Sequence, residues 1–167
     1  MEIIFKQVEN EDKQEVLQLF KDSAEKISKL NIDHWQYWKN PPLEKIKWVE
    51  EGIANHEFFF IHTLNGEHIG MVRIMEADEL YWGKQKDKAL YIHSLVVKEK
   101  HNGKGLGAVI IQKIANKAKE ADCSYVRLDA EAKNTKLCSY YEGLGFEKVG
   151  SKELSLSTYN LYQKELK

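Results

Sequence analysis

The sequence predicts an α+β domain in which helices flank a mixed, mostly antiparallel twisted sheet with one central parallel strand pair. Three patterns support this prediction: an early stretch with helical periodicity, a β-hairpin signal, and a strand, glycine loop, helix and strand in succession from residue 89. A strand that returns through a helix lies parallel to the first strand, whereas strands joined by short turns are antiparallel. We expect residues 1–167 to form a single domain.

The first half of the chain contains one strand, two helices and a hairpin. "IIFKQV" is expected to be the first strand, and "EDKQEVLQLFKDSAEKISKL" a helix. "NIDHWQYWKNPP" is irregular, because Pro41 and Pro42 prevent a helix from continuing. A shorter helix over residues 43–55 precedes the hairpin "EFFFIHTL", Asn65-Gly66, "EHIGMVRIME". The predicted buried face of the first helix consists of Val16, Leu17, Phe20, Ala24 and Ile27.

The second half begins with a polar loop, "YWGKQKDK", and the strand "ALYIHSLVV". A helix then follows the glycines, "SYVRLDA" is a strand and "NTKLCSYYEGLG" a short helix, and "FEKVG" and "STYNLYQKEL" are closing strands. The buried face of the long helix is expected to contain Ile110, Ile111, Ile114, Ala115, Ala118 and Ala121.

Composition excludes several classes of protein. The chain is 43% hydrophobic and 31% charged with a net charge of −1, so no overall charge draws it to nucleic acid or an anionic membrane. The acidic start does not resemble a secretory signal, and no window approaches the ~18 apolar residues of a membrane span. Cys123 and Cys138 lack metal-type spacing, and the histidines form no HExxH pair. We therefore expect a cytoplasmic protein without a metal site.

The segment "NGKGLGA" at residues 102–108 is the clearest chemical signal. Glycines this dense let a backbone approach a ligand closely or adopt positive φ. The N-terminus of the helix that follows presents N–H groups and a positive dipole end. The segment therefore predicts a phosphate site.

Two common phosphate motifs fit this segment less well. Gly103, Gly105 and Ala108 match the dinucleotide pattern G-x-G-x-x-G/A, with Asp129 near the expected acidic position. However, residues 98–102 separate the strand from the first glycine, and too few residues follow Asp129 to complete a doubly wound sheet. A P-loop is excluded because no GKS or GKT closes the segment.

A third pattern extends over three segments. Residues 102–107, "NGKGLG", follow Gln/Arg-x-x-Gly-x-Gly/Ala between a strand and a helix. "YIHSLVV" and "VRLDA" precede and follow that unit, and "NTKLCSYYEGLGFEKVG" contains an Asn followed by Tyr-Glu-x-x-Gly-Phe. In these segments, over residues 90–150, the chain resembles the GNAT superfamily of acetyl-CoA-dependent N-acetyltransferases. The order of the earlier elements agrees with that family's fold.

The resemblance implies that acetyl-CoA is the cosubstrate. In the family the pyrophosphate lies on the backbone N–H groups of the loop, and the pantetheine arm pairs with the fourth strand. Asn102 stands where the family usually has Gln or Arg, so we expect weaker anchoring, helped by Lys104. The implied cofactor-binding residues are Leu95, Val96, Val97, Asn102, Gly103, Lys104, Gly105, Leu106, Gly107, Ala108 and Asn134.

Two adjacent tyrosines compete for the role of general acid, the group that protonates the departing thiolate. A tyrosine is protonated at neutral pH and suits that role. At helical spacing Tyr141 shares a face with Asn134 and Cys138, whereas Tyr140 points with Leu137. The family motif also places the acid at Tyr141. We therefore expect Tyr141 to be catalytic and Tyr140 to be an amphipathic core residue.

His93 is the candidate base. It lies two residues before Leu95, where several family members carry a histidine or glutamate that takes the amine proton. A structural strand histidine is the alternative. Glu76, Asp78 and Glu79 are further alternatives that could bind a cationic substrate. Asp129 is expected only to fix local hydrogen bonds.

Aromatic residues suggest where the acceptor binds. In the family the first helices and their loop wall this site, which favours a pocket for a small amine, although core packing explains aromatic residues equally. The leading function is an N-acetyltransferase for a small-molecule amine. A peptide or protein N-acetyltransferase and a non-catalytic CoA-binding sensor are alternatives, an NAD-dependent oxidoreductase ranks last, and a homodimer is left open. The predicted substrate-binding residues are Trp35, Trp38, Glu76, Tyr81 and Trp82.

Overall fold

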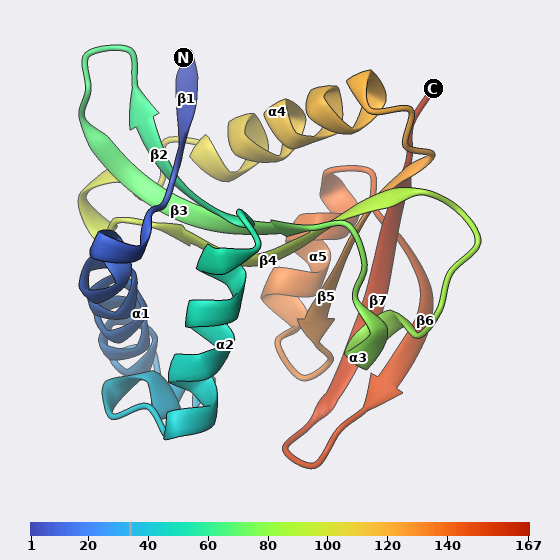
Figure 1. Cartoon of the computed structure of the whole chain (residues 1–167). Helices are drawn as coiled ribbons and strands as arrows, with labels where there is room; N and C mark the ends of the chain where they lie inside the picture. The colour runs from blue at the N-terminus through green and yellow to red at the C-terminus, as the bar shows by residue number, and fades with distance from the viewer. Residues whose placement is uncertain (34) are drawn as a thin grey trace. The chain divides into compact units, whose positions relative to one another are not determined.

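The computed structural model describes residues 1–33 and 35–167, and in that part of the chain seven strands form one sheet (Figure 1). The strand order is β1-β2-β3-β4-β5-β7-β6. The β4–β5 pair is parallel, and β1–β2, β2–β3, β5–β7 and β6–β7 are antiparallel. The predicted α+β class with a central parallel pair is confirmed. The strands are β1 (Ile3–Gln7), β2 (Phe58–Thr63), β3 (His68–Met75), β4 (Ala89–Val97), β5 (Tyr125–Glu131), β6 (Glu147–Glu153) and β7 (Thr158–Glu165). The helices are α1 (Lys13–Ser28), α2 (Leu43–Ala54), α3 (Glu79–Trp82), α4 (Leu106–Glu120) and α5 (Thr135–Gly143).

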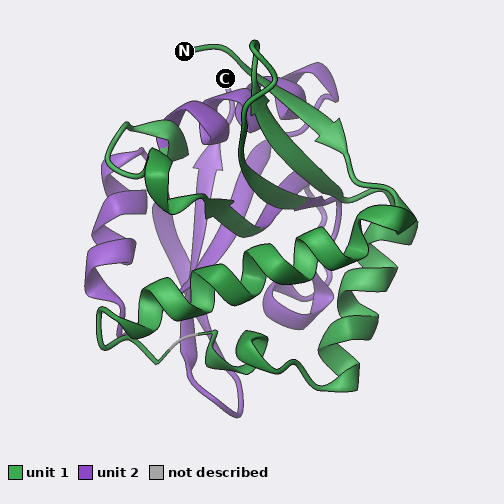
Figure 2. Cartoon of the chain, turned by 90° about the vertical axis from the view of Figure 1, so that its left-hand side faces the viewer, with its two compact units in different colours: residues 1–73, 94–107 green, residues 74–93, 108–167 purple. Residues whose placement is uncertain are grey.

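The contacts of the chain divide it into two compact units (Figure 2). Unit 1 contains residues 1–73 and 94–107, and unit 2 contains residues 74–93 and 108–167. The chain passes from one unit to the other within β3, within β4 and in the first turn of α4. The expectation of a single domain stays a prediction.

Helix α1 contributes one face to the core of unit 1. That face is shifted slightly from the predicted one, because Leu19 is buried whereas Leu17 and Ile27 are only half-buried. A 3₁₀ turn at Gln36–Lys39 packs along the helix and selects this face. The buried residues of α1 are Val16, Leu19, Phe20, Ser23 and Ala24.

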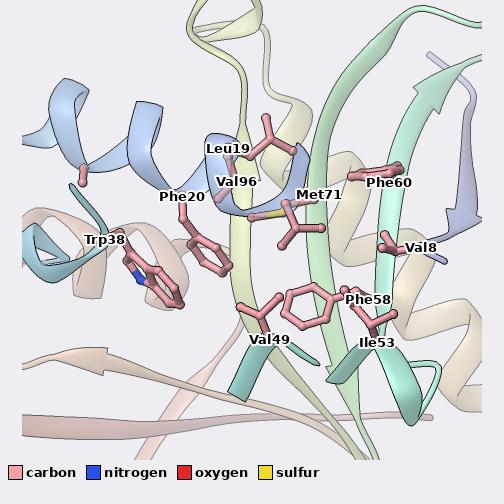
Figure 3. Packing of buried hydrophobic residues seen from close by; sticks show 12 residues of the cluster. Val8, Leu19, Phe20, Trp38, Val49, Ile53, Phe58, Phe60, Met71 and Val96 are labelled. Carbon is pink, nitrogen blue, oxygen red and sulfur yellow. The ribbon is translucent and has the colours of Figure 1, made fainter. Parts of the chain in front are cut away.

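Aromatic rings hold the core of unit 1 together (Figure 3). Trp38 lies in the segment expected to be irregular, and its ring stacks on Phe20 with 3.9 Å between centroids. The edge of Phe58 meets the same Phe20 ring at 6.4 Å. At Gly70 the backbone of β3 comes very close to the backbone of β4. An added Cβ would lie 2.0 Å from the carbonyl oxygen of Val96, so no side chain fits at this position. The aromatic core therefore depends on residues from α1, the 3₁₀ turn, β2 and β4.

Unit 2 contains one element that the sequence did not indicate, the four-residue helix α3. The sequence there suggested a polar loop, because one helical turn is too short to show periodicity. Asp78 caps α3, accepting a hydrogen bond from the backbone N–H of Tyr81 at 3.3 Å. The face predicted for α4 is buried from Ile110 to Ala118, but Ala121 lies beyond the helix and is exposed. In the part of the chain that the structure describes, we find no helix long and apolar enough to cross a membrane.

Candidate active site

The glycine loop has the geometry expected of a phosphate cradle. Gly103 and Gly105 adopt φ of +77° and +71°, which L side chains rarely take. A Cβ added at either glycine would meet no heavy atom within 4 Å, and both residues are exposed. Helix α4 begins directly afterwards at Leu106, so its first N–H groups have no carbonyl of the preceding turn to bind. These residues fit a compact anion such as a pyrophosphate.

Strand β4 changes conformation at Ser94. Its parallel ladder with β5 joins Ala89–Tyr91 to Tyr125–Arg127. Ser94 then takes φ of +54°, a strained value for serine in the middle of a strand and of the kind found at functional sites. Among the predicted pantetheine contacts, Val96 is buried in the core of unit 1, so its backbone is the part left for a ligand. Leu95 and Val97 are only half-buried.

His93 lies between two carboxylates of unit 2. Its Nε2 is 2.6 Å from Oδ2 of Asp78, and its Nδ1 is 3.8 Å from Oδ1 of Asp129. The imidazole is 14% exposed, Asp78 6% and Asp129 11%, so water screens these charges poorly. The candidate base therefore belongs to a carboxylate–imidazole–carboxylate cluster. The sequence offered Asp78 as a group for a cationic substrate and Asp129 for local hydrogen bonds, and it gave no signal that both meet His93.

Asp129 has an unusual environment for a carboxylate. Within residues 1–33 and 35–167 no hydrogen-bond donor reaches its buried Oδ1. The pKa of Asp129 is raised from 3.8 to about 6, because burial raises it most and the charge of Asp78 adds to this, while His93 acts in the opposite direction. Perturbed carboxyl groups of this kind are typical of functional sites. Sequence spacing gave no signal of this, because only the sheet pairing places Asp129 beside His93.

Tyr141, the predicted general acid, has a buried hydroxyl. Burial raises the pKa of its hydroxyl, and the nearby charge of Asp129 raises it further. Its ring contacts Phe146 and Tyr162, with centroids 5.9 and 6.4 Å away. Tyr141 therefore stays protonated throughout the physiological range, as a general acid requires.

Tyr140 differs from the core residue that we expected. Its side chain is 43% exposed, because this face of α5 is open to solvent at that position. Burial of the hydroxyl raises its pKa, while a hydrogen bond from the backbone of Ala108 lowers it. Tyr140 therefore lies against the first turn of α4. Asn134, predicted to bind the cofactor, uses its side-chain oxygen to cap α5 by accepting from the backbone N–H of Leu137 at 3.2 Å.

The predicted acceptor residues have different environments. Trp38 is 3% exposed and Trp82 is 8% exposed, so packing accounts for most of their surface. Trp35 is half-buried and Glu76 is exposed. The ring of Tyr81 contacts the candidate base, with its centroid 5.6 Å from that of His93.

Unit 1 contains a cavity that sequence reasoning missed. Its volume is about 390 Å³, and it lies between α1 and the end of β4. The lining from α1 and its C-terminal end has two acids followed by two lysines, which in the sequence look like an ordinary solvated helix face. The charged lining residues are Asp22, Glu25, Lys26, Lys29, Lys98, Glu99 and Lys100.

The cluster around His93 also meets a distance criterion for metal binding. One donor atom from each of Asp78, His93 and Asp129 lies within 4.8 Å of the others. The two nitrogens of the single imidazole face different carboxylates, however, and their lone pairs diverge. This arrangement favours hydrogen bonding in series over ligation of one ion by all three side chains.

The mixed sheet with its central parallel pair and the glycine loop at the start of α4 are the features of an N-acyltransferase type of domain. The sequence model of the acetyltransferase (GNAT) family matches residues 16–146, and the chain belongs to that family. The resemblance inferred from the loop and the closing motif is confirmed.

Curated relatives match only part of their length. The chain is 29% identical over 112 residues to the uncharacterized N-acetyltransferase YesJ of Bacillus subtilis, which covers 64% of this chain and 61% of that protein. It is 31% identical over 68 residues to the thialysine N-epsilon-acetyltransferase of Bos taurus, covering 41% of this chain and 40% of that protein. The matches therefore span less than two thirds of either relative.

Solved structures share the fold over nearly the whole chain. A GNAT-family acetyltransferase from Listeria monocytogenes has a TM-score of 0.81 and 24% identity, covering 99% of this chain and 96% of that chain. A chimera of Vibrio cholerae spermidine N-acetyltransferase SpeG and hSSAT has a TM-score of 0.70 and 14% identity, covering 99% and 96%. A chain of the NatC complex bound to Gag peptide and CoA has a TM-score of 0.66 and 17% identity, covering 100% of both.

Proposed function

We propose that the protein transfers an acetyl group from acetyl-CoA to the amino group of a small molecule, with Tyr141 as general acid and His93 as general base. The observation that carries the proposal is the position of Asp129. It lies 3.8 Å from His93, and its charge acts on the hydroxyl of Tyr141. A proton acceptor and a proton donor therefore share one neighbourhood within unit 2.

The glycine loop supports acetyl-CoA as the donor substrate. The open space at Gly103 and Gly105 and the N-terminus of α4 suit a pyrophosphate. Acetyl-CoA supplies the acetyl group as a thioester, whose sulfur needs a proton as it departs. Backbone N–H groups bind the anion without a side chain, which compensates for the short Asn102.

The acid and base have complementary tasks. An alkyl ammonium group has a pKa near ~10 and must lose a proton before its nitrogen can attack. His93 takes that proton on an imidazole nitrogen, and Tyr141 donates its hydroxyl proton to the departing sulfur. The raised pKa of Tyr141 keeps its proton in place until charge develops on that sulfur.

A small cationic amine fits the groups around His93. Asp78 and Asp129 supply negative charge, and the rings of Tyr81 and Tyr159, with centroids 5.3 Å apart, supply aromatic faces. Among the related proteins, two have names that specify small amines, thialysine and spermidine. The NatC neighbour, bound to a peptide, favours the second candidate, a peptide N-acetyltransferase. We place either reaction in the cytoplasm, where Cys123 and Cys138 stay reduced.

The test is a screen of amines with acetyl-CoA, read by release of the CoA thiol. Pools should include diamines, amino acids and short peptides with free N-termini. We expect turnover with a small amine and a loss of kcat in Tyr141→Phe. Turnover of peptides alone would favour the second candidate, and binding of acetyl-CoA without any transfer would indicate a sensor.

A further inference from the structure

Asp78 constrains the candidate base from one side. One carboxylate oxygen, Oδ1, accepts the backbone N–H of Tyr81 and so is fixed by the α3 cap. The other, Oδ2, lies 2.6 Å from Nε2 of His93. An ionised carboxylate only accepts hydrogen bonds, so Nε2 carries the hydrogen in this contact. In neutral imidazole the other nitrogen, Nδ1, is then the one that can take a proton.

Asp129 faces that second nitrogen. Its Oδ1 is buried, and no donor reaches it from within the described residues. A buried acceptor without a donor costs free energy, which a new N–H group beside it would recover. Protonated Nδ1 of His93, only 3.8 Å away, would supply this N–H after a small approach. Asp129 is therefore better matched to imidazolium than to neutral imidazole.

We propose that Asp78 and Asp129 are positioning residues for acetyl transfer that act through His93: Asp78 fixes the imidazole through Nε2, and Asp129 stabilises the Nδ1–H formed when His93 takes a proton from the attacking ammonium. An N–H bond of the ammonium breaks and the Nδ1–H bond forms, with no change of oxidation state. The proton later leaves Nδ1 for solvent. This inference rests on the proposed function, because it takes His93 as the base.

Other titratable groups surround the imidazole and affect its pH dependence. Tyr81 approaches from α3, with its ring centroid 5.6 Å from that of His93. Burial raises the pKa of Tyr141 on α5 and of Tyr159 on β7, and the charge of Asp129 raises each further. Tyr141 and Tyr159 therefore stay neutral below pH 9. Asp78 and Asp129 are the carboxylates that lie against the two ring nitrogens, so their charges act directly on His93.

The first experiment detects the tautomer without any substrate. Long-range ¹H–¹⁵N spectra of the whole protein report which ring nitrogen carries hydrogen, and His93→Gln assigns the signal. We expect the Nε2–H form of His93 at pH 7.5 in the parent, and a mixture of tautomers in Asp78→Asn. Asp129→Asn should keep the Nε2–H form and lower the imidazole pKa. An Nδ1–H form of His93 in the parent would overturn the proposal. A second refuting result would be a metal response: Zn²⁺ at micromolar concentration would shift the His93 signal in the parent but in neither Asn variant.

The second experiment measures kcat/KM against pH with an amine that turns over. Asp78→Asn and Asp129→Asn should each lower kcat/KM by about tenfold or more, but by less than the ~10²–10⁴-fold expected when the base itself is removed by His93→Gln. The acid limb should move to lower pH in both, because each removes a negative charge that favours imidazolium. Asp78→Glu should recover part of the rate. Asp87→Asn, the same change at an exposed site, is the control.

The outcomes separate the inference from the proposed function. If both Asn variants match Asp87→Asn in rate and acid limb while His93→Gln is impaired, the inference is wrong and the base assignment stands. If His93→Gln is as active as the parent, the proposed base is wrong. A merely structural role would lower stability and rate in Asp78→Asn without moving the acid limb of its pH profile.

Discussion

Replacing Trp38 by alanine should destabilise the protein strongly and leave recognition of the amine largely unchanged. A buried tryptophan removes about 150–250 Å² from water. At about 25 cal/mol per Å², this burial contributes about 4–6 kcal/mol. Trp38 is 3% exposed, so nearly the whole side chain counts. Alanine retains some of that burial, and we expect a loss of about 3–5 kcal/mol in the free energy of unfolding.

Part of this cost comes from Phe20. The two rings stack with centroids 3.9 Å apart and planes 9° from parallel, so alanine leaves one face of Phe20 against a cavity. Trp38→Phe keeps a ring at that position and should cost clearly less than alanine. The gap between the two variants then measures the stacked ring itself.

Urea unfolding followed by circular dichroism measures the change, with acetyl-CoA and acceptor KM determined on the folded fraction. The alternative is that Trp38 forms a wall of the acceptor site. An unfolding midpoint like the parent's in Trp38→Ala, together with an acceptor KM raised tenfold or more, would refute the packing argument.

The remaining predictions concern the chemistry of the site. Tyr141→Phe should lower kcat by about 10²–10⁴-fold in steady-state assays, whereas Tyr140→Phe should stay within a few fold. Gly105→Val should abolish the thermal stabilisation by acetyl-CoA. Gly66→Val is the control: its glycine has a similar positive φ in the hairpin turn, so the variant should be equally strained but should keep the stabilisation by acetyl-CoA. Asp129→Asn should raise the free energy of unfolding at pH 7.5 by up to about 3 kcal/mol, because each pKa unit between 3.8 and about 6 corresponds to about 1.4 kcal/mol.

The sign of the Asp129 effect follows from proton linkage. The Asp129 carboxyl holds its proton more tightly in the folded state than in the unfolded state. Ionisation of Asp129 therefore lowers the parent's free energy of unfolding, fully above pH 6 and progressively less as the pH falls towards 4. The gain in the free energy of unfolding of Asp129→Asn over the parent should therefore decrease over the same pH range. A gain that does not depend on pH would contradict this prediction. Full kcat in Tyr141→Phe, or a thermal shift lost equally in Gly66→Val, would contradict the other two predictions.

Local patterns in the sequence determined the elements and the family. Helical periodicity, the Asn65-Gly66 turn and the glycine loop each act over a few neighbouring residues, so they predicted the hairpin, α4 and the parallel β4–β5 pair. The acid at Tyr141 and the base at His93 were also proposed from sequence, by motif and strand position. Their roles stay predictions until the variants are measured.

Tertiary structure alone decided which side chains surround His93. Asp78 precedes it by 15 residues and Asp129 follows by 36, and no periodicity links such distant positions. The four-residue helix α3 turns Asp78 towards the imidazole, and the parallel register of β4 with β5 brings Asp129 to its other nitrogen. The same holds for Trp38, whose aromatic segment could equally have lined a pocket or filled a core. Burial and long-range charge depend on the packing of elements that meet only after the chain has folded, because neither is a property of adjacent residues.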